Sequence, residues 1–258
     1  MNFCTFDDVK EYIKDENTLF SYIDNPKTFM VELFPYYTDS KEGNLAKYAR
    51  GKDYHVVVPE MLKEIINTYK IKYPHNNFVS FCDISPLPEV YIAYKSGAGI
   101  LGRNGLIFDE KYGGYVFIGI IATDLEIQFE PPKLKSCIDC KLCEIHCPQG
   151  AISKSGVLKS KCLSFLTQEN GEILNEQDIK KSQYIWGCDI CLDICPMNKN
   201  PQKTDILTFK TELIYNLQLK DVKNLTRNQF KIKFFERAFT FRGTKPLERN
   251  LKIMSDYE

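Results

Sequence analysis

The amino-acid sequence predicts an α+β fold in which an N-terminal sheet flanked by helices precedes a cysteine-rich module and a helical tail. Apolar, β-branched segments alternate with helical patterns before the first cysteine run, and eight of the ten cysteines fall between Cys137 and Cys195. A Pro131-Pro132 linker marks the first change of composition, and a Phe- and Lys-rich stretch closes the chain. We therefore expect three domains, at residues 1–130, 131–200 and 201–258.

Composition places the chain among ordinary globular proteins. Of its 258 residues, 43% are hydrophobic and 26% are charged, and the formal net charge is zero. Any contact with nucleic acid must therefore come from a local basic patch. The N-terminus lacks the apolar segment of a signal peptide, and the longest apolar run, residues 115–122, is too short to span a bilayer. We expect a soluble, cytoplasmic protein without membrane contact.

Local patterns in the first domain predict its elements in turn. Pro59 marks the first turn of one helix, Gly97 ends another, and the Gly113-Gly114 turn separates two strands. Helices are expected at residues 7–23, 59–69 and 89–96. Strands are expected at residues 28–33, 78–82, 106–108 and 115–123.

The cysteines form two runs with ferredoxin spacing. The first is Cys137-x2-Cys140-x2-Cys143-x3-Cys147-Pro148, in which the fourth cysteine of a bacterial ferredoxin binds the other cluster. The second is Cys188-x2-Cys191-x3-Cys195-Pro196, with Cys162 upstream. By the same crossing, one 4Fe–4S cluster takes Cys137, Cys140, Cys143 and Cys195. The second cluster takes Cys147, Cys162, Cys188 and Cys191.

Zinc is the alternative, because two Cx2C pairs also suit that metal. The third cysteine of the first run and the Cys-Pro at both ends favour a ferredoxin-like double-cluster module. His146, inside the first run, is expected on a helix surface rather than as a ligand. Cys4 and Cys82 lie outside the runs and are expected to be surplus thiols.

Two further motifs indicate a function only weakly. Residues 97–102 match GxGxxG, but they follow a helix and precede a strand, the reverse of the order that a dinucleotide site requires. We expect a tight loop there. Asp53-Tyr54-His55 begins like the Asp-x-His-x-x-Gly of cobalamin proteins, but position 58 is Val. His55 is therefore expected to be packed or hydrogen-bonded.

Together these segments resemble the epoxyqueuosine reductase family, the cobalamin-dependent iron–sulfur enzymes of queuosine tRNA modification, which are related to reductive dehalogenases. The resemblance covers roughly residues 28–253. It includes both cysteine runs and is carried further by residues 48–55, 83–86, 96–104, 117–119, 162–167, 186–189 and 234–250.

The resemblance implies a base-off cobalamin between the N-terminal domain and the cluster module. Family positions that touch the corrin fall on Asp83, Ile107, Ile118, Leu163, Ser164, Gly187, Asp189, Ile190 and Leu192. Asp83 aligns with the family's proton donor. Its apolar neighbours are expected to bury it and raise its pKa, whereas the alternative is an Asp that caps the helix beginning at Glu89.

The implied reaction is a two-electron, two-proton reduction of an epoxide to an alkene, with loss of water. Flavodoxin or ferredoxin would be the electron donor. The tail interleaves Phe with basic residues, which suits a tRNA surface and equally suits a helix packed through its Phe face. Family members continue into helical repeats near the point where this sequence ends. Two other hypotheses therefore stay open: a cobalamin and iron–sulfur reductase of a free nucleoside or organohalide, and a cobalamin-free electron-transfer protein.

Overall fold

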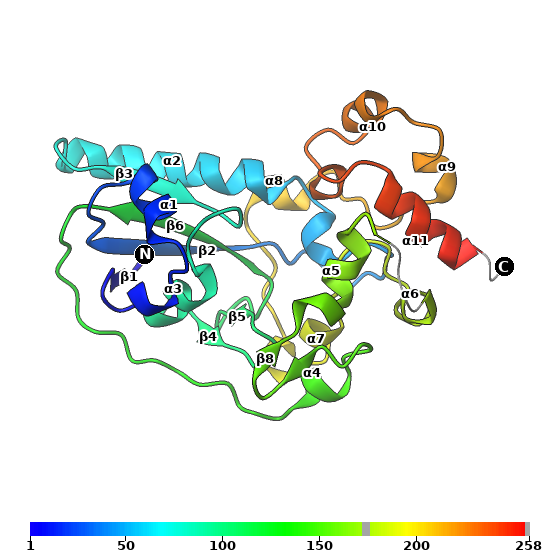
Figure 1. Cartoon of the computed structure of the whole chain (residues 1–258), viewed down its shortest axis with the longest axis horizontal. Coiled ribbons are helices and arrows are strands. Elements are labelled where there is room, and N and C mark those ends of the chain that lie inside the picture. Colours follow the sequence, from blue (N-terminus) through cyan, green and yellow to red (C-terminus); the bar gives the residue numbers. More distant parts are fainter. Residues whose placement is uncertain (172–175, 256–258) are drawn as a thin grey trace. The chain divides into compact units, whose positions relative to one another are not determined.

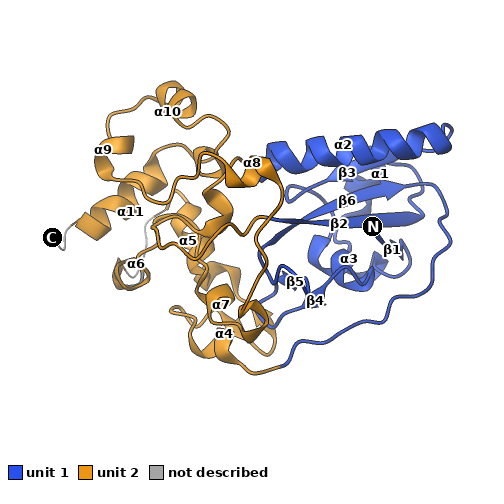
Figure 2. Cartoon of the chain, turned by 180° about the vertical axis from the view of Figure 1, so that it is seen from behind, with its two compact units in different colours: residues 1–35, 54–138 blue, residues 36–53, 139–258 orange. Residues whose placement is uncertain are grey.

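The computed structural model describes residues 1–171 and 176–255. Contacts between Cα atoms divide the chain into two compact units, 1–35 with 54–138 and 36–53 with 139–258 (Figure 2). Residues 36–53, which the sequence assigned to the first domain, thus belong to the same unit as the cysteine runs. The tail after residue 200 belongs to that unit as well.

The first unit is built on a four-stranded antiparallel sheet (Figure 1). The central strands are long and mostly buried, which agrees with their runs of β-branched and aromatic residues. In spatial order the strands are β1 (Asn2–Thr5), β2 (Thr28–Pro35), β6 (Val116–Thr123) and β3 (Phe78–Phe81).

Helices cover both faces of this sheet, as the fold prediction requires. On one face, side chains of β2 and β6 such as Phe29 and Ile120 share a core with Ile92 of α3 (Glu89–Lys95) and Leu19 of α1 (Glu16–Tyr22). The long helix α2 (Tyr54–Lys72) contacts β6 and β3. The expected α+β architecture is therefore confirmed.

Two local predictions were wrong in detail. The region 7–23 forms a 3-10 turn at Lys10–Tyr12 and then α1, because the Asp15 carboxylate accepts the Thr18 N–H and starts a new helix there. The helix expected at 59–69 begins at Tyr54, so that Pro59 lies inside it. A proline is a sound start signal only when no helical turn precedes it.

The two strands expected on either side of the Gly113-Gly114 turn are present, but they do not pair with each other. β5 (Ile107–Phe108) pairs with β4 (Ile100–Leu101), whereas β6 lies between β2 and β3. Only an isolated bridge from Asp109 to Gly113 closes the turn. The apolar β6 is mostly buried, and a central place in the sheet gives its backbone a partner on each side.

The GxGxxG segment is the tight loop that was expected. Gly97 follows α3 with φ of 73°, and a Cβ at this position would lie 2.5 Å from the Cβ of Pro132. β4 begins at Ile100, so the motif connects a helix to a strand. Gly97 therefore allows close packing against the linker, and Gly99 and Gly102 allow close packing against Phe108, so the glycines serve packing rather than binding of a dinucleotide.

The second unit consists of short helices and a small ribbon of β7 (Ile152–Ser153) and β8 (Gly156–Val157). Its helices are α4 (Leu142–Ile145), α5 (Leu163–Gln168), α6 (Glu176–Ser182), α7 (Ile190–Asp193), α8 (Leu207–Lys210), α9 (Leu219–Val222), α10 (Arg227–Lys233) and α11 (Lys245–Ser255). Single-turn 3-10 helices lie at Lys47–Ala49, Lys159–Lys161, Pro196–Asn198 and Ala238–Thr240.

The tail packs on the cysteine-rich region, as expected. α11 contacts α5 and α6, and its buried Asn250 donates from Nδ2 to the carbonyls of Thr167 at 2.8 Å and Ile185 at 2.7 Å. Across the described residues, no helix combines the length and apolar character that a membrane span needs.

The core of the first unit gives a stability prediction. Phe29→Ala should lower the free energy of unfolding by about 3–5 kcal/mol, because it empties a fully buried ring site. Ile71→Ala, at an 86% exposed position of α2, is the matched control and should cost less than about 0.5 kcal/mol. Anaerobic urea unfolding followed by far-UV circular dichroism measures both, and equal losses would contradict the placement of Phe29.

Candidate functional site

The two cysteine runs come together through their helices. Cys143 lies on α4 and Cys191 on α7, and these two helices contact each other. Ahead of α4, Asp139 and Lys141 both have positive φ, at 52° and 62°, which bends the chain into a tight loop. Such a loop is what a run of cysteines around one cluster needs.

Three of the thiols predicted to bind the second cluster influence one another electrostatically. Burial raises the pKa of Cys188, the N–H of Ile190 opposes this rise, and the neighbouring thiols of Cys191 and Cys162 add to it. A fourth predicted ligand, Cys147, accepts the N–H of Ala151 at its sulfur, at 3.3 Å. Within the described residues, no three His, Cys, Asp or Glu side chains lie close enough to hold a single metal ion.

The other cysteines and His146 take the places expected of them. His146 is exposed, and its Nδ1 lies 3.0 Å from the carbonyl oxygen of Leu142. Cys4 is buried in the core of the first unit, where burial raises the pKa of its thiol to about 12. Cys82 is partly buried. Cys137 belongs to the first unit and Cys140 to the second.

The loop that carries the second run is braced by residues 44–50. The N–H of Ala46 donates to the carbonyl of Trp186 at 2.9 Å, and the N–H of Gly187 donates to Oγ1 of Thr167 at 3.0 Å. Gly187 has φ of 73°, and a Cβ there would lie 2.5 Å from that of Ala46. No residue with a side chain fits this position without displacing the brace.

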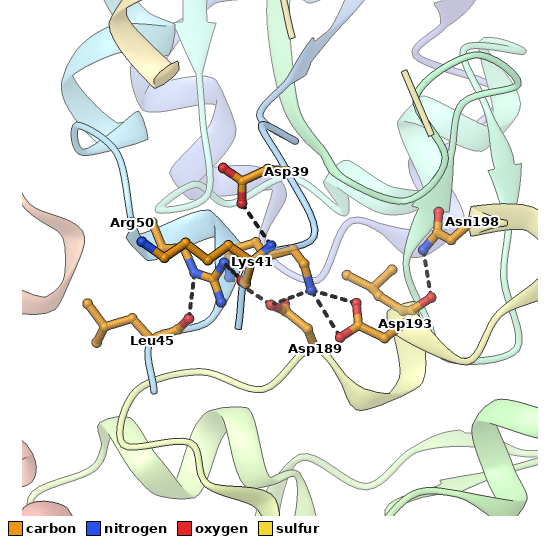
Figure 3. Close-up of polar contacts among 9 residues, drawn as sticks. Asp39, Lys41, Leu45, Arg50, Asp189, Asp193 and Asn198 are labelled. Carbon is orange, nitrogen blue, oxygen red and sulfur yellow. Dashed lines mark hydrogen bonds and ion pairs between the residues drawn. The ribbon is translucent and has the colours of Figure 1, made fainter. Parts of the chain in front are cut away.

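Asp189 is the buried charged residue at the centre of the contacts between this loop and residues 44–50 (Figure 3). Its Oδ2 accepts the backbone N–H of Lys47 at 2.7 Å and lies 3.7 Å from the Lys47 ammonium. The same ammonium contacts both oxygens of Asp193, at 2.7 and 3.0 Å. Burial raises the pKa of Asp189, and Lys47 opposes that rise.

Sequence reasoning missed Lys47 entirely. The residue lies 142 positions before Asp189, and a single lysine before Tyr48-Ala49-Arg50 carries no metal or catalytic pattern. Arg50 is also buried here, and donates to the carbonyls of Leu45 at 2.9 Å and Lys41 at 2.7 Å. The family resemblance covered this stretch without assigning any role to it.

Asp83 is exposed, contrary to the expected burial. Its side chain is 57% accessible, and its backbone has a left-handed φ of 62° that Asp tolerates better than most residues. Its Oδ2 accepts the hydroxyl of Tyr54 at 2.6 Å and lies 3.0 Å from Nε2 of His55. His55 is therefore hydrogen-bonded, as expected.

Asp83 is not the cap of α3, so the capping alternative was wrong. The helix begins after Pro88 without a side-chain cap, and instead Glu89 reaches back to accept the N–H of Asp83 at 3.0 Å. Its other oxygen accepts the hydroxyl of Ser85 at 2.7 Å. Burial raises the pKa of Glu89, while these two hydrogen bonds work against the rise.

The predicted corrin positions fall in both units. Most of them are buried or partly buried, and Asp189 uses its carboxylate for Lys47. In the first unit they are Asp83, Ile107 and Ile118, and in the second Leu163, Ser164, Gly187, Asp189, Ile190 and Leu192. Two buried donors, Nδ2 of Asn104 and Nε1 of Trp186, have no partner within the part of the chain that the structure describes.

Much of the basic tail is used internally. Arg237 donates to the carbonyls of Arg50 and Glu212, and Arg249 donates to those of Leu166 and Glu169. Phe230, Phe234 and Phe239 are buried, whereas Phe235 and Phe241 are 72% and 58% exposed. The exposed basic residues of α10 and α11 include Arg227, Lys231, Lys245 and Lys252. The tail therefore combines a Phe face packed inside the protein with an exposed basic surface, and different residues form the two.

Comparison with known proteins defines the class to which this fold and site belong. Residues 136–198 match the family model described as "4Fe-4S double cluster binding domain". The chain is thus an iron–sulfur protein with a module for two 4Fe–4S clusters. Residues 19–84 match a second model, "Epoxyqueuosine reductase QueG, DUF1730".

The relatives name the family. The chain is 32% identical over 258 residues to the epoxyqueuosine reductase of Atelocyanobacterium thalassa, over 90% of this chain and 83% of that relative. It is 31% identical to the enzyme of Lactococcus garvieae, over 84% of this chain and 62% of that relative. The chain therefore belongs to the epoxyqueuosine reductase family. It spans less than two thirds of the Lactococcus garvieae relative.

Solved structures of the family share the fold. Epoxyqueuosine reductase from Bacillus subtilis matches at 25% identity with a TM-score of 0.82, over 98% of this chain and 76% of that chain. That structure is described as having its aspartate-bearing catalytic loop swung out of the active site. An epoxyqueuosine reductase with an epoxyqueuosine-modified tRNA stem loop matches at 24% identity, with a TM-score of 0.81 and the same coverage.

The ligand assignment of the cysteines stays a prediction and has a direct test. Cys191→Ser should lower the iron content from about eight to about four per chain, because one of the two clusters loses a thiolate. Cys4→Ser, which removes only a core thiol, is the control and should keep all the iron. Iron analysis and the visible spectrum after anaerobic purification measure the cluster content of both variants. Full iron content in Cys191→Ser would remove this residue from the ligand set.

Proposed function

We propose that the chain reduces the epoxide of epoxyqueuosine in tRNA to the alkene of queuosine, using two 4Fe–4S clusters and a base-off cobalamin. Family membership and the double-cluster module support this activity. The single observation that carries it is Asp83, at the position of the family's proton donor, with Tyr54 and His55 on one carboxylate oxygen.

Asp83 can pass on to a substrate a proton that Tyr54 or His55 supplies. Its exposed carboxyl group is accessible to a substrate, while the Tyr54 hydroxyl and the His55 ring connect it to groups that exchange protons. The reaction consumes two electrons and two protons, breaks both C–O bonds of the epoxide, and releases the oxygen as water. Asp83 would protonate that departing oxygen, and the pair behind it would restore the proton.

Cobalamin fits the residues present. A corrin carries amide side chains around an apolar ring system, and both kinds of surface are available here. In the first unit, Asn104 offers a buried donor and Ile107 a buried apolar side chain. In the second unit, Trp186 offers a buried donor, and Leu163 and Leu192 offer buried apolar side chains. When bound, the cofactor would supply the strongly reducing centre to which the clusters pass electrons. The protein supplies binding, orientation and the proton.

A tRNA substrate agrees with the exposed part of the tail. Lys231, Lys245 and Lys252 can contact phosphates, and the exposed rings of Phe235 and Phe241 can stack on bases. One structural relative is an epoxyqueuosine reductase with a tRNA stem loop that carries the epoxyqueuosine modification. Flavodoxin or ferredoxin would deliver the electrons in the cytoplasm.

Asp83→Asn tests the proton donor. The variant should keep all the iron and bind cobalamin, yet lose activity by about 10²–10⁴-fold, because an amide cannot donate the proton that a carboxylic acid does. Asn also tolerates the left-handed backbone at this position, so the loop is retained. Asp24→Asn changes an exposed aspartate of the same unit and should have no effect. Turnover of epoxyqueuosine tRNA measures both variants, and full activity of Asp83→Asn would exclude the role.

The substrate class is tested by binding. The affinity of the protein for epoxyqueuosine tRNA should fall steeply between about 50 and 200 mM salt, because each phosphate contact releases a counterion. Lys245→Ala with Lys252→Ala should weaken binding and flatten this dependence, whereas Lys10→Ala, in the first unit, should not. Filter binding across a salt series gives the slopes. Salt-independent retention, or turnover of a free nucleoside or an organohalide alone, would favour a small-molecule substrate.

A further inference from the structure

The brace around Asp189 links one lysine to two carboxylates of the second cysteine run. Lys47 donates its backbone N–H to the Asp189 carboxylate, and its ammonium donates to the Asp193 carboxylate, so both polar groups contact the same loop. Its side chain is only 11% exposed, and that of Asp189 is 2% exposed. We call Lys47, Asp189 and Asp193 the lysine brace.

We propose that Lys47 is a positioning residue that fixes the loop of the second cluster and sets the electrostatic potential at that cluster. The inference rests on the proposed ligand set, in which Cys188 and Cys191 bind the second cluster together with Cys147 and Cys162.

The first part of the inference follows from burial. A carboxylate removed from water needs a partner, and Asp189 finds both a hydrogen-bond donor and a cation in Lys47. At the far end of the loop, Nδ2 of Asn198 donates to the carbonyl of Leu192 at 2.8 Å. The segment between Cys188 and Cys195 is thus held at Asp189, Leu192 and Asp193 by residues outside it.

The second part follows from charge. Asp189 and Asp193 each lie within two positions of a cysteine of the run, so both negative charges are next to thiolates. Lys47 leaves this group of three charges with one net negative charge. Reduction of a cluster adds a further negative charge, and it is therefore opposed by the carboxylates and favoured by the ammonium.

Two groups around Asp189 stay constant in the test. Arg50 acts on Asp189 as a second cation and is not altered. Tyr36 is buried beside Asp189 and Asp193, and burial raises the pKa of its phenol further above its ordinary value, so it stays neutral. Lys47 and Asp193 are therefore the two positions at which charge can be removed while these neighbours are kept.

Opposite charge changes should move the potential in opposite directions. Lys47→Met removes the cation and should lower the midpoint potential of one cluster. Asp193→Asn removes an anion and should raise the midpoint of the same cluster. Lys47→Arg keeps the charge and should restore the wild-type value. Lys52→Met is the matched control, because Lys52 lies in the same segment but pairs with Glu236 of the tail, at 3.1 Å.

The measurement is a redox titration of the anaerobically purified holoprotein with dithionite, followed by electron paramagnetic resonance, with iron analysed in parallel. Opposite shifts of one midpoint, with the other unchanged, would support the inference. Loss of about half the iron in Lys47→Met, with full iron in Lys47→Arg and Lys52→Met, would support the positioning part.

Other outcomes would contradict the inference about Lys47. Full iron with unchanged midpoints in both Lys47→Met and Asp193→Asn would show that the brace does not act on a cluster. Shifts in the same direction, or a similar shift in Lys52→Met, would point to a general structural effect. Failure of the reductase proposal would be a separate result. Wild-type protein with about eight irons and two midpoints, but without turnover of epoxyqueuosine tRNA, would contradict the proposed activity and would not contradict the role of the lysine brace.

Discussion

The burial of one carboxylate, that of Asp189, places a requirement on chain segments far from it. A charge without water must have a donor and a cation close by, and both come from Lys47, which lies 142 positions earlier. Residues 44–50 are consequently fixed against the loop that follows Trp186, with Gly187 packed too closely to allow a side chain. The geometry of the second cysteine run thus depends on residues that contain no cysteine.

A similar arrangement occurs in the first unit. Glu89 is a partly buried acid whose oxygens accept the N–H of Asp83 and the hydroxyl of Ser85, and it thereby holds a left-handed backbone in place. Asp189 belongs to the cysteine loop and accepts the N–H of Lys47 from the segment that holds this loop, whereas Glu89 accepts the N–H of Asp83 itself. In both cases a second group contacts the carboxylate. The residues that would do chemistry are therefore positioned by acids that do none.

Sequence patterns predicted the features that depend on local order. The spacing of the cysteines, the strands around Phe29 and Phe78, and the helix at Glu89 follow from periodicity and motif, and the structure or the family models agree with them. Patterns failed where a distant partner decides the outcome. The pairing of β6 with β2 rather than β5, the exposure of Asp83, and the brace at Lys47 all depend on contacts that no local window contains.

The path of the chain between its two units has a practical consequence for dissecting the protein. The backbone passes from one unit to the other at residues 35/36, 53/54 and 138/139, so neither unit is a continuous piece of the gene. A fragment that starts at residue 139 would lack residues 44–50, which include Lys47 and Arg50, together with Cys137. A stand-alone piece with the cysteine runs would therefore lack the segment that holds the second run in place. Because the segments of the two units alternate along the chain, neither truncation nor circular permutation makes either unit continuous.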